Sequence, residues 1–227
     1  MSLRSVPRQL TLALEHSESL EREDFMGGPS NAAALALIES WPDWPSYASI
    51  LTGPEGSGKS HLAAIWAREV GARFLAARSL AGADLPAALA TGALVVEDVA
   101  EGAFDERALF HLLNLAREDQ AFVLLTARTA PATWSLNIRD LVSRLKALPV
   151  VAMSPPDDAL LRALLVKLFT DRQINVDESL IGYVAMRIER TFAAARETVA
   201  RLDQEALRRK RPLTRALAAE LLRGASS

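Results

Sequence analysis

The feature that most constrains the fold is a glycine-rich segment that matches the pattern GxxxxGK[ST] in full: Gly53, Pro54, Glu55, Gly56, Ser57, Gly58, Lys59 and Ser60. An apolar run, Ala48–Thr52, precedes it directly, and apolar residues at helical spacing follow it. In this setting the loop amides point inward at phosphates, Lys59 reaches the terminal phosphates and the Ser60 hydroxyl ligates Mg²⁺. The alternative, a glycine-rich turn without a ligand, is disfavoured by the flanking strand and helix. The segment predicts a P-loop that binds nucleotide with Mg²⁺.

Short apolar runs continue along the chain and alternate with amphipathic segments. Their Val, Leu and Ile content is typical of buried parallel strands. The five runs are Ala48–Thr52, 73–77, Ala93–Val99, 121–127 and 149–153. Between them apolar residues recur with helical period, as at Leu109, Leu112 and Leu113. Strand and helix in alternation predict an α/β fold with an open, doubly wound, five-stranded parallel sheet.

The pattern changes at Ser154, which we expect to cap a helix whose first turn holds Pro155 and Pro156. Everything beyond it has helical periodicity, and Asp177 is a second expected cap. The residues before 25 differ again, because an acidic stretch follows a short apolar peptide. We therefore predict a tail over 1–24, a nucleotide-binding α/β domain over 25–154 and a small helical domain over 155–227.

Composition excludes several classes of function. Half of the 227 residues are apolar and 24% are charged, as in ordinary globular proteins. The chain has no cysteine, which excludes disulfides and thiolate zinc sites, and its three histidines are far apart in sequence. A net charge of −2 argues against coating nucleic acid. No apolar run is long enough to cross a membrane, and the N-terminal apolar stretch from Leu10 to Leu14 is too short for the apolar region of a signal peptide, so we expect a cytoplasmic protein without a membrane partner.

A second acidic element is needed to hold Mg²⁺, and the segment Leu94-Val95-Val96-Glu97-Asp98 supplies it at the end of a predicted strand. It is similar to a Walker B motif, in which Glu97 would take the magnesium position and Asp98 would polarise the attacking water. A plain solvated strand end is the alternative. The order of these two acids is unusual for the motif and favours slow hydrolysis.

Three further segments carry a family resemblance. They are Phe25-Met26-Gly27-Gly28-Pro29-Ser30-Asn31, Leu141-Val142-Ser143-Arg144, and Arg190 followed later by Leu202-Asp203. With the P-loop, these segments resemble the Hda family of DnaA-related AAA+ proteins, which inactivate the bacterial replication initiator DnaA. The resemblance covers nearly the whole chain and implies an AAA+ domain followed by a helical lid.

The resemblance also assigns roles to residues. It implies that Phe25, Met26 and Asn31 line the adenine pocket, together with the P-loop and His61. Arg144 corresponds to the arginine finger that acts in trans, and Arg190 to the sensor-2 arginine. Read without the family, Arg144 is an ordinary solvated basic position and Arg190 a first-turn charge of the lid.

The sensor-1 region departs from the family pattern. Thr126 ends the fourth predicted strand where sensor 1 is expected, but Arg128 stands where the family usually has Asp. This departure, like the order of Glu97 and Asp98, implies weak intrinsic ATPase activity. The chain would then act mainly as an activator of hydrolysis on DnaA, and the resemblance implies that its ADP-bound form is the active one.

The N-terminal peptide resembles the motif by which the family docks on the DNA polymerase III sliding clamp. Its docking residues are Gln9, Leu10, Leu12 and Leu14. Burying two or three leucines gives roughly 3 to 9 kcal/mol before association costs, so a second contact is needed for tight binding. The alternative is a strand or amphipathic tail that packs on its own domain.

The expected function is therefore regulation of replication initiation, with DnaA and the sliding clamp (beta subunit) as partners and a homodimer left open. The chain stops at Ser227, so no residues remain for a DNA-reading domain like that of DnaA, and we expect no direct sequence-specific DNA binding. The basic cluster 208–211 ends a helix, which favours a dipole-complementing role over nucleic-acid binding. Two alternatives are an autonomous ATPase of the helicase-loader type and a small-molecule P-loop kinase.

Overall fold

The computed structural model describes residues 22–223, which form one parallel sheet, nine α-helices and three short 3-10 helices. The strands are β1 (Ala48–Thr52), β2 (Arg73–Ala76), β3 (Ala93–Val99), β4 (Phe122–Ala127) and β5 (Val150–Ala152). The helices are α1 (Ala32–Glu39), α2 (Lys59–Val70), α3 (Leu85–Leu89), α4 (Glu106–Glu118), α5 (Arg139–Ala147), α6 (Asp158–Asp171), α7 (Glu178–Ala185), α8 (Phe192–Arg209) and α9 (Arg215–Arg223). The 3-10 helices are η1 (Arg22–Asp24), η2 (Ala77–Gly82) and η3 (Pro131–Thr133).

The sheet confirms the predicted strand number and direction. All of its strands are parallel, in the order β2-β3-β4-β1-β5. Each predicted apolar run contains one strand, and β2, β4 and β5 are shorter than their runs by one or two residues. Because every strand points the same way, the loops that follow β1, β3 and β4 meet at one edge of the sheet.

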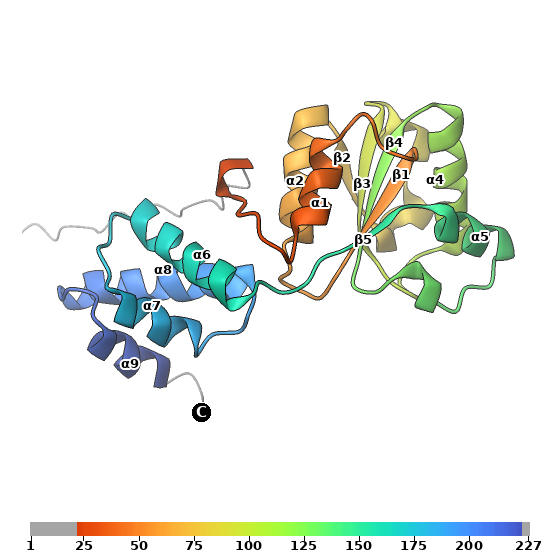
Figure 1. Ribbon diagram of the computed structural model, residues 1–227. Coiled ribbons are helices and arrows are strands. Elements are labelled where there is room, and N and C mark those ends of the chain that lie inside the picture. The colour runs from red at the N-terminus through yellow and green to blue at the C-terminus, as the bar shows by residue number, and fades with distance from the viewer. Residues whose placement is uncertain (1–21, 224–227) are drawn as a thin grey trace, which may run out of the picture.

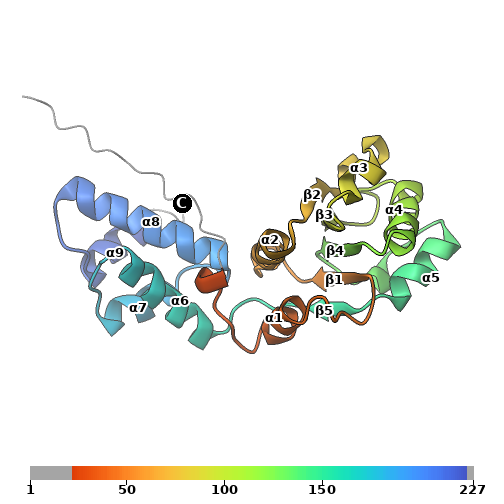
Figure 2. The same ribbon diagram turned by 90° about the horizontal axis from the view of Figure 1, so that it is seen from above.

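Helices cover both faces of the sheet (Figures 1 and 2), α1 and α2 on one face and α4 and α5 on the other. Successive strand residues point to opposite faces, so that Ile50 packs with α4 and α5 while Leu51 packs with α1 and α2. Since neither face meets water, all five residues of β1 are buried. This explains why the strand reads as a continuous apolar run instead of an alternating one.

Helices α6 to α9 form a separate unit, which we call the lid, beside the α/β domain (Figure 1). Its core is a cluster of its own, centred on Leu161, Leu165 and Phe169 of α6 and on Val199 of α8. The apolar stripes seen in the sequence therefore face one another within the lid. None of the helices in the range 22–223 is long and apolar enough to cross a membrane.

The predicted start of the first lid helix was wrong. Asp157, and not Ser154, caps α6, and its carboxylate accepts a hydrogen bond of 2.7 Å from the backbone N–H of Leu160. Helical backbone is disfavoured for a residue that precedes proline, so Ser154 and Pro155 lie outside the helix, which begins after both prolines. The prediction that Asp177 caps a helix is confirmed, by its bond of 2.7 Å from Leu180 N–H at the start of α7.

The basic cluster closes α8, as expected from the helix dipole. The helix ends at Arg209, and Lys210 follows in a left-handed conformation with φ 51°. Arg209 is paired with Glu205 at 3.1 Å and with Glu220 of α9 at 2.6 Å. Part of the cluster thus fastens α8 to α9 within the lid.

Candidate functional site

The P-loop leaves β1 in a conformation that glycine makes accessible. Gly53, Gly56 and Gly58 have φ values of 153°, 72° and 95°, which disfavour residues with side chains. A Cβ atom on Gly53 would overlap the carbonyl oxygen of Met153, and one on Gly56 would lie 2.5 Å from Cβ of Thr191. Gly53 and Gly56 are thus required both by backbone conformation and by close neighbours, and Gly58 by backbone conformation alone.

Lys59 begins α2, and its side chain lies back over the loop. Its ammonium donates to the carbonyl oxygens of Gly53 at 2.8 Å and Pro54 at 2.7 Å. Only 8% of the residue is exposed. Burial lowers the pKa of Lys59, and the nearby negative charge of Asp98 opposes that shift by raising the pKa.

This arrangement fits a phosphate ligand. The loop has left-handed glycines that turn successive amides inward, and it opens onto the N-terminus of α2, where unpaired N–H groups favour anions. Lys59 is held by two neutral carbonyl groups, which a phosphate would replace with a charged partner. Ser60 is exposed on the first turn of α2, where its hydroxyl could reach a metal ion bound to the phosphates.

Glu97, Asp98 and Thr126 gather at the same edge of the sheet, at the ends of β3 and β4. A bulge interrupts the pairing of these strands between Val96 and Val99, and Asp98 adopts φ 57° within it. The Asp98 N–H donates to the buried hydroxyl oxygen of Thr126 at 3.2 Å. Thr126 therefore supports the backbone of the acidic segment.

The two acids differ in their setting. Glu97 is half-buried, whereas Asp98 is exposed and is the carboxylate that acts most strongly on Lys59. Among residues 22–223, no group of three or more histidine or acidic side chains is arranged to hold a metal. A magnesium ion at this edge would rest on Ser60, one of these carboxylates and the phosphates.

The residues assigned to the adenine pocket meet between the sheet domain and the lid. Phe25 is buried, stacked on Phe192 of α8 at 6.3 Å and set edge-on to His61 at 5.3 Å. Asn31 is 1% exposed and closes the turn before α1, with its side chain bonded to Met26 O at 3.0 Å and Gly28 N–H at 2.8 Å. Met26 packs against the lid cluster.

The start of α8 lies directly on the P-loop. The N–H of Phe192 donates to Gly56 O at 3.2 Å, and Thr191 caps the helix by accepting from Ala194 N–H at 3.0 Å. Arg190 precedes α8 by two residues and is therefore not a first-turn charge of that lid helix. Its exposed side chain pairs with Asp158 of α6 at 2.8 Å, beside the loop.

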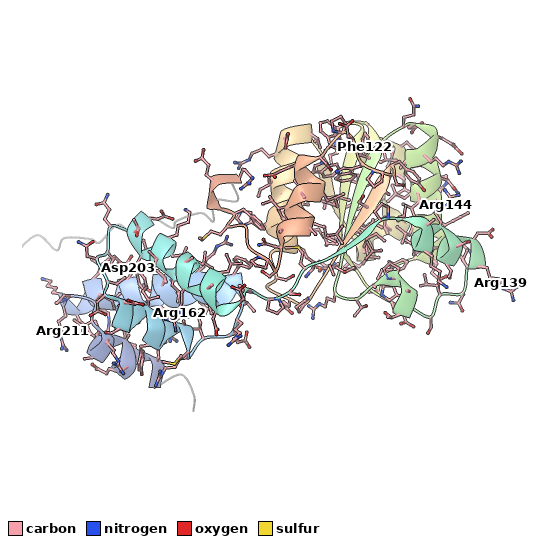
Figure 3. All side chains as sticks on the ribbon, viewed as in Figure 1. Phe122, Arg139, Arg144, Arg162, Asp203 and Arg211 are labelled. Carbon is pink, nitrogen blue, oxygen red and sulfur yellow. The ribbon has the colours of Figure 1, made fainter. Side chains whose placement is uncertain are left out.

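Arg144 lies at the opposite edge of the sheet. Its guanidinium is 3.5 Å from the hydroxyl of Tyr47, the residue before β1, and 5.2 Å from the ring centre of Phe110 on α4. The P-loop begins only after β1, whose five residues span about 16 Å. Figure 3 shows Arg144 on the side of the α/β domain that faces away from the lid. Arg144 therefore lies away from the P-loop of its own chain.

Several residues at these places were missed by sequence reasoning. Arg196, one turn after Phe192 on α8, lies 2.9 Å from Nδ1 of His61 on α2. Phe192 is part of the helical periodicity that follows Ser154, which gives it no role in a site, and nothing in the sequence marks Tyr47 or Phe110. The spacing of Phe192 and Arg196 places both on one helix face, which could have drawn attention to them. The predicted docking residues Gln9, Leu10, Leu12 and Leu14 lie outside the described residues.

We compared the chain with family models, with curated proteins and with solved structures. No family model matches the chain, and no curated protein matches its sequence. Among solved structures, domain III of the replication initiation protein DnaA from Thermotoga maritima aligns with a TM-score of 0.74 at 19% identity, over 92% of this chain and 97% of that one.

Two further structures align over most of this chain. AMPPCP-bound DnaA from Aquifex aeolicus gives a TM-score of 0.69 at 16% identity, over 86% of this chain and 69% of that one. The Holliday junction branch migration motor RuvB from Thermotoga maritima gives 0.69 at 18%, over 88% and 70%.

The fold and the loop together define the class: this chain has the AAA+ P-loop fold, an all-parallel five-stranded sheet with helices on both faces. Within that class, its architecture is similar to that of domain III of DnaA over nearly the full length of both chains.

Proposed function

We propose that this chain is a AAA+ regulator of DNA replication initiation, which binds an adenine nucleotide and stimulates hydrolysis of the ATP held by DnaA. The observation that carries the proposal is the position of Arg144 at the sheet edge opposite its own P-loop. An arginine placed there serves a neighbouring molecule and not its own nucleotide. The similarity to domain III of DnaA supports a partner with the same fold.

The roles of the chain's own residues follow from their places. The P-loop amides and Lys59 hold the phosphates, while Phe25 and the start of α8 enclose the base between sheet and lid. Magnesium bound with the nucleotide would neutralise phosphate charge, and Ser60 and Glu97 are the residues that would hold it. With ADP in this site, the protein keeps its lid in place and offers Arg144 to the partner.

Arg144 would supply positive charge to the transition state of hydrolysis on DnaA. An arginine finger provided in trans raises such rates by roughly 10³ to 10⁵. The contacts that hold it are weak, since 3.5 Å is at the limit of a hydrogen bond and one guanidinium on a partly exposed ring contributes about 0.5 to 1 kcal/mol. The side chain is thus ordered near the surface and released at low cost.

The sharpest experiment measures hydrolysis of DnaA-bound ATP in the presence of the sliding clamp loaded on DNA. Arg144→Ala should lose most of the stimulation, whereas Arg139→Ala, an exposed arginine on the first turn of the same helix, should retain it. Equal stimulation by Arg144→Ala and the wild type would overturn the proposal. High intrinsic turnover that DNA increases would instead favour an autonomous ATPase of the helicase-loader type.

Docking on the clamp is the second part of the proposal and has its own test. In this second part, Gln9, Leu10, Leu12 and Leu14 enter pockets of the clamp, and docking there brings Arg144 to DnaA near the replication machinery. Binding of the chain to immobilised clamp should fall strongly for Gln9→Ala and be unchanged for Arg144→Ala. Undiminished binding by Gln9→Ala would remove this part and leave the role of Arg144 standing.

A further inference from the structure

An ion pair joins Glu55 of the P-loop to Arg128, the residue that follows β4. Arg128 directly follows β4, which runs beside β1 with Ala127 opposite Thr52, and the N–H of Gly53 donates to Ala127 O at 3.2 Å. The backbone of Arg128 thus lies next to the start of the P-loop, and its side chain extends from there. Its Nη2 atom lies 2.9 Å from Oε2 of Glu55, the third residue of the motif.

The pair is well exposed to solvent and is easily exchanged for another partner. The side chain of Arg128 is 65% exposed and that of Glu55 is 80% exposed. Ion pairs in such positions contribute little to folding, because water screens them and both side chains lose rotamer freedom. Neither residue is needed to hold the α/β domain together.

Both charges nevertheless act on the lysine of the site. Arg128 adds to the lowering of the Lys59 pKa that burial causes, and Glu55 opposes it, each less strongly than Asp98. Arg128 and Glu55 therefore lie within electrostatic range of the ammonium that meets the phosphates. A di- or triphosphate in the loop would attract the guanidinium and repel the carboxylate.

We propose that Arg128 is a further phosphate-binding residue of this nucleotide site, and that Glu55 is its counter-ion only in the free protein. When a nucleoside di- or triphosphate binds, Arg128 exchanges Glu55 for phosphate oxygens. A guanidinium suits this exchange because its planar fork matches two oxygens of one phosphate. The inference rests on the proposed nucleotide binding. It adds a residue to which the family pattern gives no role in the site.

The test is a titration of the full chain with fluorescent N-methylanthraniloyl ATP and ADP. Arg128→Ala should weaken binding about tenfold, the loss expected for one charge-assisted hydrogen bond to phosphate. Glu55→Gln should tighten binding severalfold, because it frees Arg128. Arg208→Ala, an exposed arginine paired with Glu205 in the lid, is the matched control and should bind as the wild type does.

The double variant separates exchange of partners from simple repulsion by Glu55. If Glu55 acts by holding Arg128, the gain of Glu55→Gln disappears in the Arg128→Ala background. A gain of the same size in that background, or unchanged affinity of Arg128→Ala, would overturn the inference. If Arg128→Ala weakens the binding of both nucleotides, Arg128 contacts the β-phosphate. If it weakens the binding of ATP alone, Arg128 contacts the γ-phosphate. Either result supports the inference.

The outcome also distinguishes this inference from the proposed function. Binding that Lys59→Ala abolishes and Arg128→Ala leaves unchanged would overturn the inference alone. A wild-type chain that binds neither nucleotide would overturn both. Arg128→Lys, which keeps the charge and loses the fork, should bind between Arg128→Ala and the wild type.

Discussion

The guanidinium of Arg196 on α8 lies 2.9 Å from Nδ1 of His61 on α2, and this contact joins the lid to the helix that follows the P-loop. A guanidinium can only donate hydrogen bonds, so Nδ1 accepts. His61 is 6% exposed and also meets the edge of Phe25, so the contact is shielded from water. The lid is thus fixed to the helix whose N-terminus faces the phosphates.

Replacing Arg196 should loosen the lid without unfolding it. Arg196→Met keeps much of the side-chain length but removes the donor, so backbone amides in the first turns of α8 should exchange hydrogen faster. Nucleotide affinity should fall severalfold, because a mobile lid must be ordered on binding. Hydrogen exchange by mass spectrometry checks this, with Arg201→Met on an exposed position of the same helix as control. Equal protection of α8 in both variants would contradict it.

Alanine at position 56 should be more harmful than alanine at another left-handed glycine. Gly56 has φ 72° and its Cβ would lie 2.5 Å from Thr191, whereas Gly71 has φ 71° and nothing within 4 Å. Gly71→Ala should therefore show the backbone strain alone, about 1 to 2 kcal/mol. Gly56→Ala should lower the free energy of unfolding, measured in urea, by more than this amount. It should also displace α8 from the loop. Equal losses of stability would show that Thr191 moves away freely.

Glu106 should make the stability of the fold depend on pH. Its carboxylate accepts hydrogen bonds of 2.9 Å from the backbone N–H groups of Asn137 and Ile138, and these hold the pKa of Glu106 below its ordinary value of 4.5. A lowered pKa stabilises the fold above pH 4.5, and this contribution is lost as the pH falls through the folded-state pKa.

The glutamine variant gives the measurement. Glu106→Gln should lower the melting temperature by roughly 2 to 4 °C at pH 7, and the difference from the wild type should shrink as the solution is acidified below pH 4.5. Glu118→Gln, at the exposed other end of α4, should leave the melting temperature nearly unchanged. A difference that stays constant down to pH 3 would contradict the assignment.

The ring beneath Arg144 should matter more than the hydroxyl beside it. Phe110→Leu removes the aromatic face 5.2 Å from the guanidinium, which should reduce stimulation of DnaA-bound ATP hydrolysis about two- to fivefold. Tyr47→Phe removes a contact of 3.5 Å and should have little effect. Rates from single-turnover assays compare the two, and the reverse order would show that Tyr47 positions Arg144.

The strands and the P-loop were predictable because each is marked by adjacent residues. An apolar run such as Ala48–Thr52 is buried on both faces, so its sequence shows where the strand lies, and GxxxxGKS carries the loop conformation in its glycines. The start of α6 was misplaced because two competing signals lie within four residues, and the backbone restriction before proline outweighed the capping preference of Ser154.

Contacts between lid and α/β domain could not be predicted in the same way. His61 and Arg196 are separated by 135 residues. At that distance in sequence, neither residue indicates that the other is its partner. Arg128 was recognised only as a departure from a family pattern, since its pairing with Glu55 depends on β1 and β4 lying side by side. Such pairings depend on strand order, which alternation of strands and helices alone leaves open.

The segment 25–31 contacts both the lid and the α/β domain. It runs beside the connection from β5 to α6, where Ser154 N–H donates to Ser30 O at 3.0 Å, and a Cβ on Gly28 would come within 3.0 Å of Leu160. Phe25 belongs to the core of the α/β domain, while Met26 packs in the lid. Two adjacent segments, 25–31 and the connection from β5 to α6, therefore lie between the lid and the α/β domain. We therefore expect any opening of the lid to be a rotation about an axis near these two segments, which would break the contacts of Arg196 with His61 and of Phe192 with Gly56.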